Sequence, residues 1–185
     1  MRKRRNINRI AAIDPGIRAL GFAILEGEKL LFGTVLTSGS ERRGSGASRE
    51  LLRSVSRLLA EWSPKTLVLE RTPDARNRSL APVYALSRAI LRRARRRKLR
   101  TEEIAAATVR RVLLGDRKAS KERMARYVAS RYPALRPYLV PGNSGQGRHF
   151  QNLSDAIATG LCFLVQRERG DRRRDLSSEL PIVRL

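Results

Sequence analysis

The sequence predicts a single α/β domain with a mixed five-stranded sheet, in which three antiparallel strands are followed by parallel strands and helices flank the sheet. Three short apolar segments come first, at residues 9–14, 19–26 and 29–37, and only turn residues separate them. After residue 48, segments with helical periodicity alternate with short apolar segments, which is typical of strands joined by helical crossovers. A chain of 185 residues is the right size for one domain.

The later elements follow from periodicity and from turn residues. An amphipathic helix at residues 48–62 ends at Ser63-Pro64, and the apolar segment 66–69 that follows is typical of a strand buried on both faces. Residues 99–114 are ambiguous, because Thr101-Glu102-Glu103 resembles a helix start while a strand followed by a helix also fits. The remaining expectations are helices at 81–98, 120–132 and 152–166 and a loop at 137–147.

Both ends of the chain are predicted to lie outside the domain. We expect a basic extension at residues 1–8, the folded domain at 9–167 and a basic, solvated tail at 168–185. The basic N-terminus precedes a short strand and not the apolar core of a signal peptide, and no segment is apolar enough to span a membrane. Cys162, the one cysteine, lies in an apolar run and is expected to be buried. These features favour a cytoplasmic protein that is associated with the nucleoid.

The charge of the chain indicates a polyanionic partner. Lys and Arg number 40 against 17 Asp and Glu, which gives a net charge of +23. The helix expected at 81–98 and the residues just after it contribute eight basic residues between Arg88 and Arg100. Such a charge raises the cost of compaction unless a polyanion such as nucleic acid neutralises it. Composition alone does not separate an enzyme from a nucleic-acid-binding protein.

Three carboxylates lie at the ends of otherwise apolar elements. Asp14 follows the first apolar segment and precedes Pro15-Gly16, and Glu70 follows the strand at 66–69. Carboxylates at strand ends converge on one edge of an α/β sheet. Asp155 lies on the last predicted helix, three residues after Asn152 and outside its apolar stripe. Because buried carboxylates are costly unless a cation holds them, the set predicts a site for Mg²⁺ or Mn²⁺. Two such ions hydrolyse phosphodiesters by in-line displacement.

Four blocks of the sequence resemble the RuvC-type Holliday junction resolvases. The first is Asp14-Pro15-Gly16 with the glycine at Gly21, and the second is Glu70 with Arg76-Asn77 and the helix start at 85–89. The third spans Val109 to Gly115 and Ala119-Ser120-Lys121-Glu122, and the fourth is Leu153 to Ala158. The blocks stand in the family's order, from about residue 10 to residue 165.

The resemblance implies an RNase H-like fold, with a strand and then a helix within 99–114. It also implies a homodimer that cuts opposite strands of a four-way DNA junction by paired symmetric nicks, with two Mg²⁺ ions per site and Mn²⁺ able to replace them. By carry-over, Asp14, Glu70 and Asp155 are metal ligands, and Lys121 contacts DNA near the scissile phosphate. The basic residues that we predict to contact DNA are Arg18, Arg71, Arg76, Arg78, Arg110, Arg111, Lys118 and Lys121.

The sequence departs from the family at two places. The family has Asp or His three residues before the last aspartate, and this chain has Asn152, which we predict to be a catalytic residue and the fourth metal ligand, because its amide oxygen can bind Mg²⁺ although it carries no charge. His149, the one histidine, is an alternative ligand. The aromatic residue that the family often places after the second-block glutamate is absent from Arg71-Thr72-Pro73, which leaves the opening of the junction to other residues, such as Arg71, Arg76, Arg78 or Tyr84.

Two alternatives to a junction-cutting endodeoxyribonuclease are also consistent with the sequence. One is a nuclease of the same fold that acts on RNA–DNA hybrids or in transposition. The other is a binding module that kept the fold and the basic surface but lost the chemistry. Intact Asp14, Glu70 and Asp155 argue against the second alternative.

Overall fold

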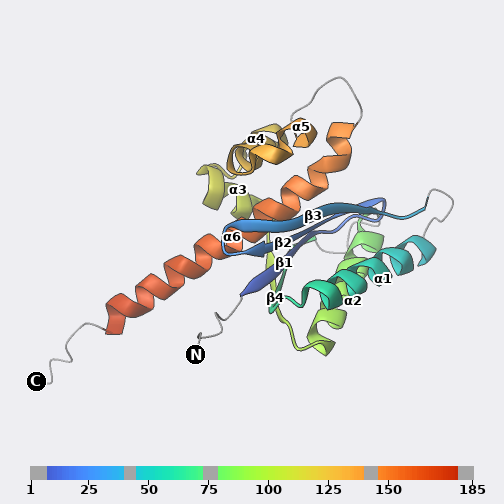
Figure 1. Ribbon diagram of the computed structural model, residues 1–185, viewed down its shortest axis with the longest axis horizontal. Coiled ribbons are helices and arrows are strands. Elements are labelled where there is room, and N and C mark those ends of the chain that lie inside the picture. The colour runs from blue at the N-terminus through green and yellow to red at the C-terminus, as the bar shows by residue number, and fades with distance from the viewer. Residues whose placement is uncertain (1–7, 40–44, 73–78, 140–145, 179–185) are drawn as a thin grey trace, which may run out of the picture.

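The computed structural model describes residues 8–39, 45–72, 79–139 and 146–178 of the chain (Figure 1). It contains one five-stranded sheet with the strand order β3-β2-β1-β4-β5. β2 is antiparallel to its neighbours β1 and β3, and β4 runs parallel to β1 and β5. This arrangement confirms the predicted fold class. The strands are β1 (Arg9–Asp14), β2 (Ala19–Glu26), β3 (Lys29–Thr37), β4 (Thr66–Glu70) and β5 (Arg100–Ile104).

Helices cover both faces of the sheet (Figure 1). α1 (Ser45–Trp62) and α2 (Ala81–Arg96) pack on one face, where they bury one hydrophobic cluster against β1, β2 and β4. A second cluster fills the opposite face beneath α6, with α3 and α4 packed against it. The elements on that side are α3 (Ala106–Leu114), α4 (Lys121–Arg131), the 3₁₀ turn Pro133–Leu135, α5 (Arg136–Leu139) and α6 (Gln146–Ser178).

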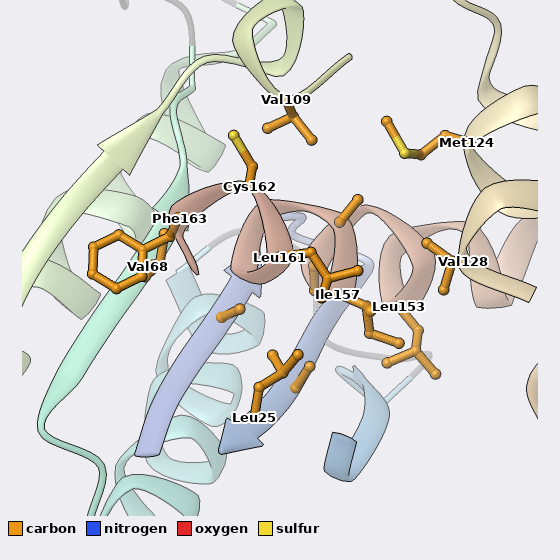
Figure 2. Packing of buried hydrophobic residues seen from close by; sticks show 14 of the residues in the cluster. Leu25, Val68, Val109, Met124, Val128, Leu153, Ile157, Leu161, Cys162 and Phe163 are labelled. Atoms are coloured by element: carbon orange, nitrogen blue, oxygen red, sulfur yellow. The ribbon is translucent and has the colours of Figure 1, made fainter. Parts of the chain in front are cut away.

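α6 is the central helix of its layer. Figure 2 shows Leu153, Ile157 and Leu161 on this helix among the buried side chains of the second cluster. Cys162 is buried in the same cluster, as expected. α6 approaches β2 closely, because a Cβ atom at Gly21 would overlap the carbonyl of Asn152 and lie 2.9 Å from the backbone nitrogen of Leu153. Glycine therefore sets the separation between this helix and the sheet.

The structure differs from the prediction at the last helix and at the loop before it. The last helix begins at Gln146 and continues to Ser178, so it is not limited to residues 152–166. Beyond Gln166 the segment is strongly polar, but it contains no proline, and its arginines and glutamate are good helix formers. The ion pair between Arg167 and Asp171, at 3.8 Å and four residues apart, also favours the helix. A short helix, α5, also occupies the start of the predicted 137–147 loop.

The ambiguous segment 99–114 forms a strand and then a helix, as the resemblance implied. β5 is an edge strand whose sequence Arg-Thr-Glu-Glu-Ile is mostly polar. Its parallel pairing with β4 sets its conformation in place of local propensity. Across the described residues, no helix is long and apolar enough to cross a membrane.

Candidate active site

Three carboxylates meet at one edge of the sheet. β1 and β4 are parallel, with Ile13 opposite Leu69, so the residues that follow, Asp14 and Glu70, emerge side by side at the strand ends. Asp155 comes to the same place from α6, which crosses these strands. The three side chains line a cavity of about 70 Å³, whose other walls are Ala106, Val109, Arg110, Lys121, Met124 and Ala158.

Burial and mutual repulsion make these carboxylates hard to ionise. Burial raises the pKa of Asp14 well above its usual range, and the charges of Glu70 and Asp155 raise it further. Burial, reinforced by Asp155, likewise raises the pKa of Glu70 from 4.5 to about 7. The pKa of Asp155 is also raised by burial, although Lys121 opposes the shift. A bound cation would favour the ionised forms and relieve this repulsion.

Two basic side chains and one amide surround the carboxylates. The Lys121 Nζ lies 3.7 Å from the Asp155 Oδ2, and Gln151, one helical turn before Asp155, donates from Nε2 to the Asp155 Oδ1 at 3.2 Å. Arg110 on α3 lies near enough to lower the pKa values of Glu70 and Asp155. Ser120 caps α4 by accepting from the backbone nitrogen of Arg123, and this N-cap fixes the first turn that carries Lys121.

The donor set fits a hard divalent cation. Three carboxylates in a small polar cavity offer only oxygen ligands, the kind that Mg²⁺ and Mn²⁺ prefer. As the side chains stand, no three acidic, histidine or cysteine side chains in the described parts of the chain surround a point at ligand distance. Lys121 and Gln151 engage both oxygens of Asp155 instead. A bound cation would compete with these two partners for the oxygens of Asp155.

The structure brings only some of the predicted site residues to this cavity. Arg110 and Lys121 line it, but Asn152 does not; its side-chain amide donates to the backbone carbonyl of Ala19. His149 lies in the first turn of α6, and its side chain is outside the described part of the structure, as are Arg76 and Arg78. The remaining predicted DNA contacts, which are Arg18, Arg71, Arg111 and Lys118, are exposed and do not line the cavity.

Gln151 is a site residue that the sequence analysis missed. Its position four residues before Asp155 places the two side chains on one helix face, which is a signal that the sequence contains. Glutamine at that spacing is also an ordinary feature of exposed helix surfaces. Sequence alone therefore did not single it out.

We expect Glu70→Gln to stabilise the protein above pH 7 in EDTA. The unfolded chain loses the Glu70 proton near pH 4.5 and the folded chain near pH 7, so the free energy of unfolding falls between these values and is level above them. The glutamine variant lacks this fall, which is about 3 kcal/mol. Urea denaturation at pH 5 and pH 8 measures it, with the exposed Glu61→Gln as the control. Parallel pH profiles for wild type and Glu70→Gln would contradict the expectation.

Comparisons with known proteins point to one family. Residues 10–163 match the family described as "Crossover junction endodeoxyribonuclease RuvC". Relatives of that name include a protein from Acidiphilium cryptum, 31% identical over 83% of this chain and 89% of the relative, and one from Pelodictyon phaeoclathratiforme, 29% identical over 91% and 84%. The solved RuvC structure from Thermus thermophilus has a TM-score of 0.69 at 23% identity, covering 88% of this chain and 96% of that one. A T. thermophilus RuvC solved with a Holliday junction substrate has a TM-score of 0.68, with the same identity and coverage.

Proposed function

Because this chain belongs to the RuvC family of crossover junction endodeoxyribonucleases, we propose that it is a structure-selective endonuclease that resolves four-way DNA junctions. The observation that carries the proposal is the cavity in which Asp14, Glu70 and Asp155 meet. These are the carboxylates of the first, second and fourth family-like blocks. Such a set is suited to metal-assisted phosphodiester hydrolysis.

We propose that these three carboxylates hold divalent metal, with Mg²⁺ as the natural ion, Mn²⁺ as a substitute and two ions per site. When bound, such ions activate water and stabilise the leaving 3′ oxygen of the cut strand. The raised pKa values of the carboxyls predict that metal competes with protons at this site, so half-saturating Mg²⁺ should fall as the pH rises from 6 to 8.

The protein's own contribution is to place the phosphate over the carboxylates. Lys121 and Arg110 sit beside them on two different helices, α4 and α3, and their charges face the cavity. Phosphate oxygens of the scissile group would replace Asp155 as the partner of the Lys121 ammonium. Both cations oppose the negative charge that builds on the phosphate in the transition state.

We expect Lys121→Gln to lower the single-turnover rate of junction cleavage by about 10²-fold, the usual cost of losing one donor to a developing charge. Junction affinity should fall less than tenfold, because one exposed phosphate contact contributes little to the total. The matched control is Lys118→Gln, an exposed lysine that does not line the cavity. Equal cleavage rates for the Lys121→Gln and Lys118→Gln variants would show that Lys121 has no specific role in cleavage.

One site makes one nick, so the proposed reaction needs two chains. We propose a homodimer whose two cavities cut opposite strands at symmetric positions of the junction. Shape and phosphate contacts, which are common to all sequences, would select the junction over linear duplex.

Cleavage of a labelled immobile four-way junction tests this function directly. Linear duplex and an RNA–DNA hybrid of the same length serve as competing substrates, in Mg²⁺ and in Mn²⁺. Paired symmetric nicks in the junction alone support the proposal. Preferential cutting of the hybrid would mean that the protein is a nuclease of another class with the same fold. Junction binding without cleavage in either metal would indicate a non-catalytic binding module.

A further inference from the structure

The opposite edge of the sheet carries a dense basic surface that the proposed reaction does not use. Arg100 follows α2 and begins β5, and its backbone nitrogen donates to the Lys65 carbonyl, just before β4 begins. α1 likewise ends just before β4. Both helices therefore end at the edge where the parallel strands start, whereas Asp14 and Glu70 lie where strands end. α2 has 16 residues, so its two ends are about 24 Å apart.

Six exposed cations make up this surface, which we call the distal basic surface. Arg93 joins the two helices, because its Nη1 donates to the Ser56 Oγ of α1 at 3.1 Å. Arg92 and Arg96 lie on the outer face of α2, since the buried residues Ile90, Leu91 and Ala94 occupy the opposite side. The six residues are Arg57, Arg92, Arg93, Arg96, Arg97 and Lys98, and within the described part of the chain none of them forms an ion pair.

The positive charge of the distal basic surface does not stabilise the fold. A few basic residues in the last turn favour a helix through its dipole, but like charges four apart, as at Arg92 and Arg96, destabilise it. The chain also places Lys98 in the left-handed conformation, φ 59°, at the end of α2, where glycine is the usual residue. In the first half of α2 the exposed residues Pro82 and Ala85 are uncharged, and the charge of Arg88 is paired with Glu103. The cations are therefore concentrated at the end away from the carboxylates.

We propose that the distal basic surface binds a second segment of duplex DNA, through its phosphates, while the carboxylate edge engages the cut strand. The partner follows from the chemistry, because closely spaced guanidinium groups without carboxylate partners match a row of phosphates. This inference rests on the proposed function for the identity of the nucleic acid as DNA. It adds a second contact, at the opposite edge of the sheet from the carboxylates and independent of catalysis.

Salt dependence of DNA binding tests the second surface. A variant with Arg92, Arg96, Arg97 and Lys98 all changed to Gln is compared with a control of equal charge, in which Lys29, Arg126, Arg136 and Arg169 are changed to Gln. These four control residues are exposed and belong to β3, α4, α5 and α6, not to the helices α1 and α2 or the turn after α2 that form the distal basic surface. We expect the slope of log K against log salt for junction binding to fall by about 2–4 in the first variant and by less than 1 in the control.

Cleavage separates this inference from the proposed function. The rate from saturated protein–junction complexes should be unchanged in the distal variant, because the carboxylate cavity is intact. Equal slopes of log K against log salt for the distal and control variants would overturn the proposal that the distal basic surface binds DNA, whether or not the wild-type protein cuts junctions. The Arg92→Gln, Arg96→Gln double variant, which removes a repulsive pair and so should fold, gives the same comparison at half the charge if the larger variant proves unstable.

A second inference concerns Asn152 and comes from a separate contact. The side-chain amide nitrogen of Asn152 donates to the carbonyl of Ala19, the residue that begins β2. The turn after Asp14 is packed against it, since a Cβ at Gly16 would lie 3.2 Å from that amide nitrogen. The amide therefore joins the first turns of α6 to the turn that follows Asp14. Asn152 does not line the carboxylate cavity.

We infer that Asn152 is a positioning residue that holds Asp155 beside Asp14, and that it is not a metal ligand. The inference rests on the proposed function only for the presence of a metal. An aspartate at this position would set a carboxylate against the Ala19 carbonyl, two acceptors with no proton between them. A ligand role predicts the opposite outcome, because added negative charge strengthens cation binding.

Two variants, Asn152→Asp and Asn152→Ala, separate the roles. We expect both to lower the melting temperature in EDTA by about 2–4 °C, the effect of one lost hydrogen bond in a domain of this size. Mg²⁺ affinity, measured by calorimetry, should not rise in Asn152→Asp. Mg²⁺ binding about tenfold tighter in Asn152→Asp, or more than tenfold weaker in Asn152→Ala at unchanged melting temperature, would overturn the positioning role. Wild-type cleavage, assayed separately, reports on the proposed function.

Discussion

Asp14→Asn is expected to abolish junction cleavage while leaving junction binding and folding intact. Asp14 is the carboxylate most strongly affected by its surroundings, because it is buried and faces both Glu70 and Asp155. It lies at the end of β1, a strand whose buried residues pack in both hydrophobic clusters, so its position is held firmly. Asparagine keeps the shape of the side chain and removes the charge that a divalent cation requires.

The expected loss is about 10³-fold or more in the single-turnover rate, since metal-assisted stabilisation of the transition state is worth several kcal/mol and 1.4 kcal/mol corresponds to about tenfold. Binding should change little, because the basic surface that contacts phosphates is untouched. The variant should be at least as stable as wild type in EDTA at pH 8, because it removes a charge that burial disfavours.

Quenched time courses on a junction, with fluorescence anisotropy for binding and urea denaturation for folding, measure the three quantities. Asp116→Asn is the matched control, an aspartate outside the cavity that pairs with Arg123. Cleavage by Asp14→Asn within tenfold of wild type would mean that the carboxylate cavity is not the catalytic site.

The strand-end carboxylates could be predicted because the local sequence determines their place. Asp14 and Glu70 each follow a short apolar strand, and parallel pairing of β1 with β4 brings such ends to one edge. Asp155 followed from the apolar stripe of its helix and from the family-like block around it. The charges that the cavity adds to the three carboxylates, at Arg110 and Lys121, were reached only through the family resemblance.

The sequence could not predict which residues the side chains of α6 contact. Helical periodicity shows which face of a helix carries a residue, but not what lies opposite that face. Asn152 and Asp155, three residues apart, therefore looked like a pair of ligands, although Asn152 bonds to Ala19 and Gln151 bonds to Asp155. The length of α6 was missed because a charged helix that leaves the body of the domain has no apolar stripe to mark it.

Gly21→Ala is the substitution that we expect to destabilise the fold most. Gly21 pairs with Asp14 in the β1–β2 ladder, and α6 crosses directly over it. The added methyl group would overlap the Asn152 carbonyl and lie 2.9 Å from the Leu153 nitrogen. Both obstacles are helix backbone, which no side-chain rotation can move. α6 would have to shift as a whole, and it packs on β1, β2 and β4 in the core.

The expected cost is about 3 kcal/mol or more in the free energy of unfolding, at or above the upper end of what overpacking usually costs. Gly170→Ala is the control, because a Cβ there meets nothing within 4 Å and alanine should stabilise the helix slightly. Urea denaturation measures both. A loss below about 1 kcal/mol would show that α6 can move away from the sheet at little cost. Asp155 lies on α6, so any movement of this helix away from the sheet would also separate Asp155 from Asp14. We therefore expect the cleavage rate to fall together with the stability in Gly21→Ala, and to be unchanged in Gly170→Ala.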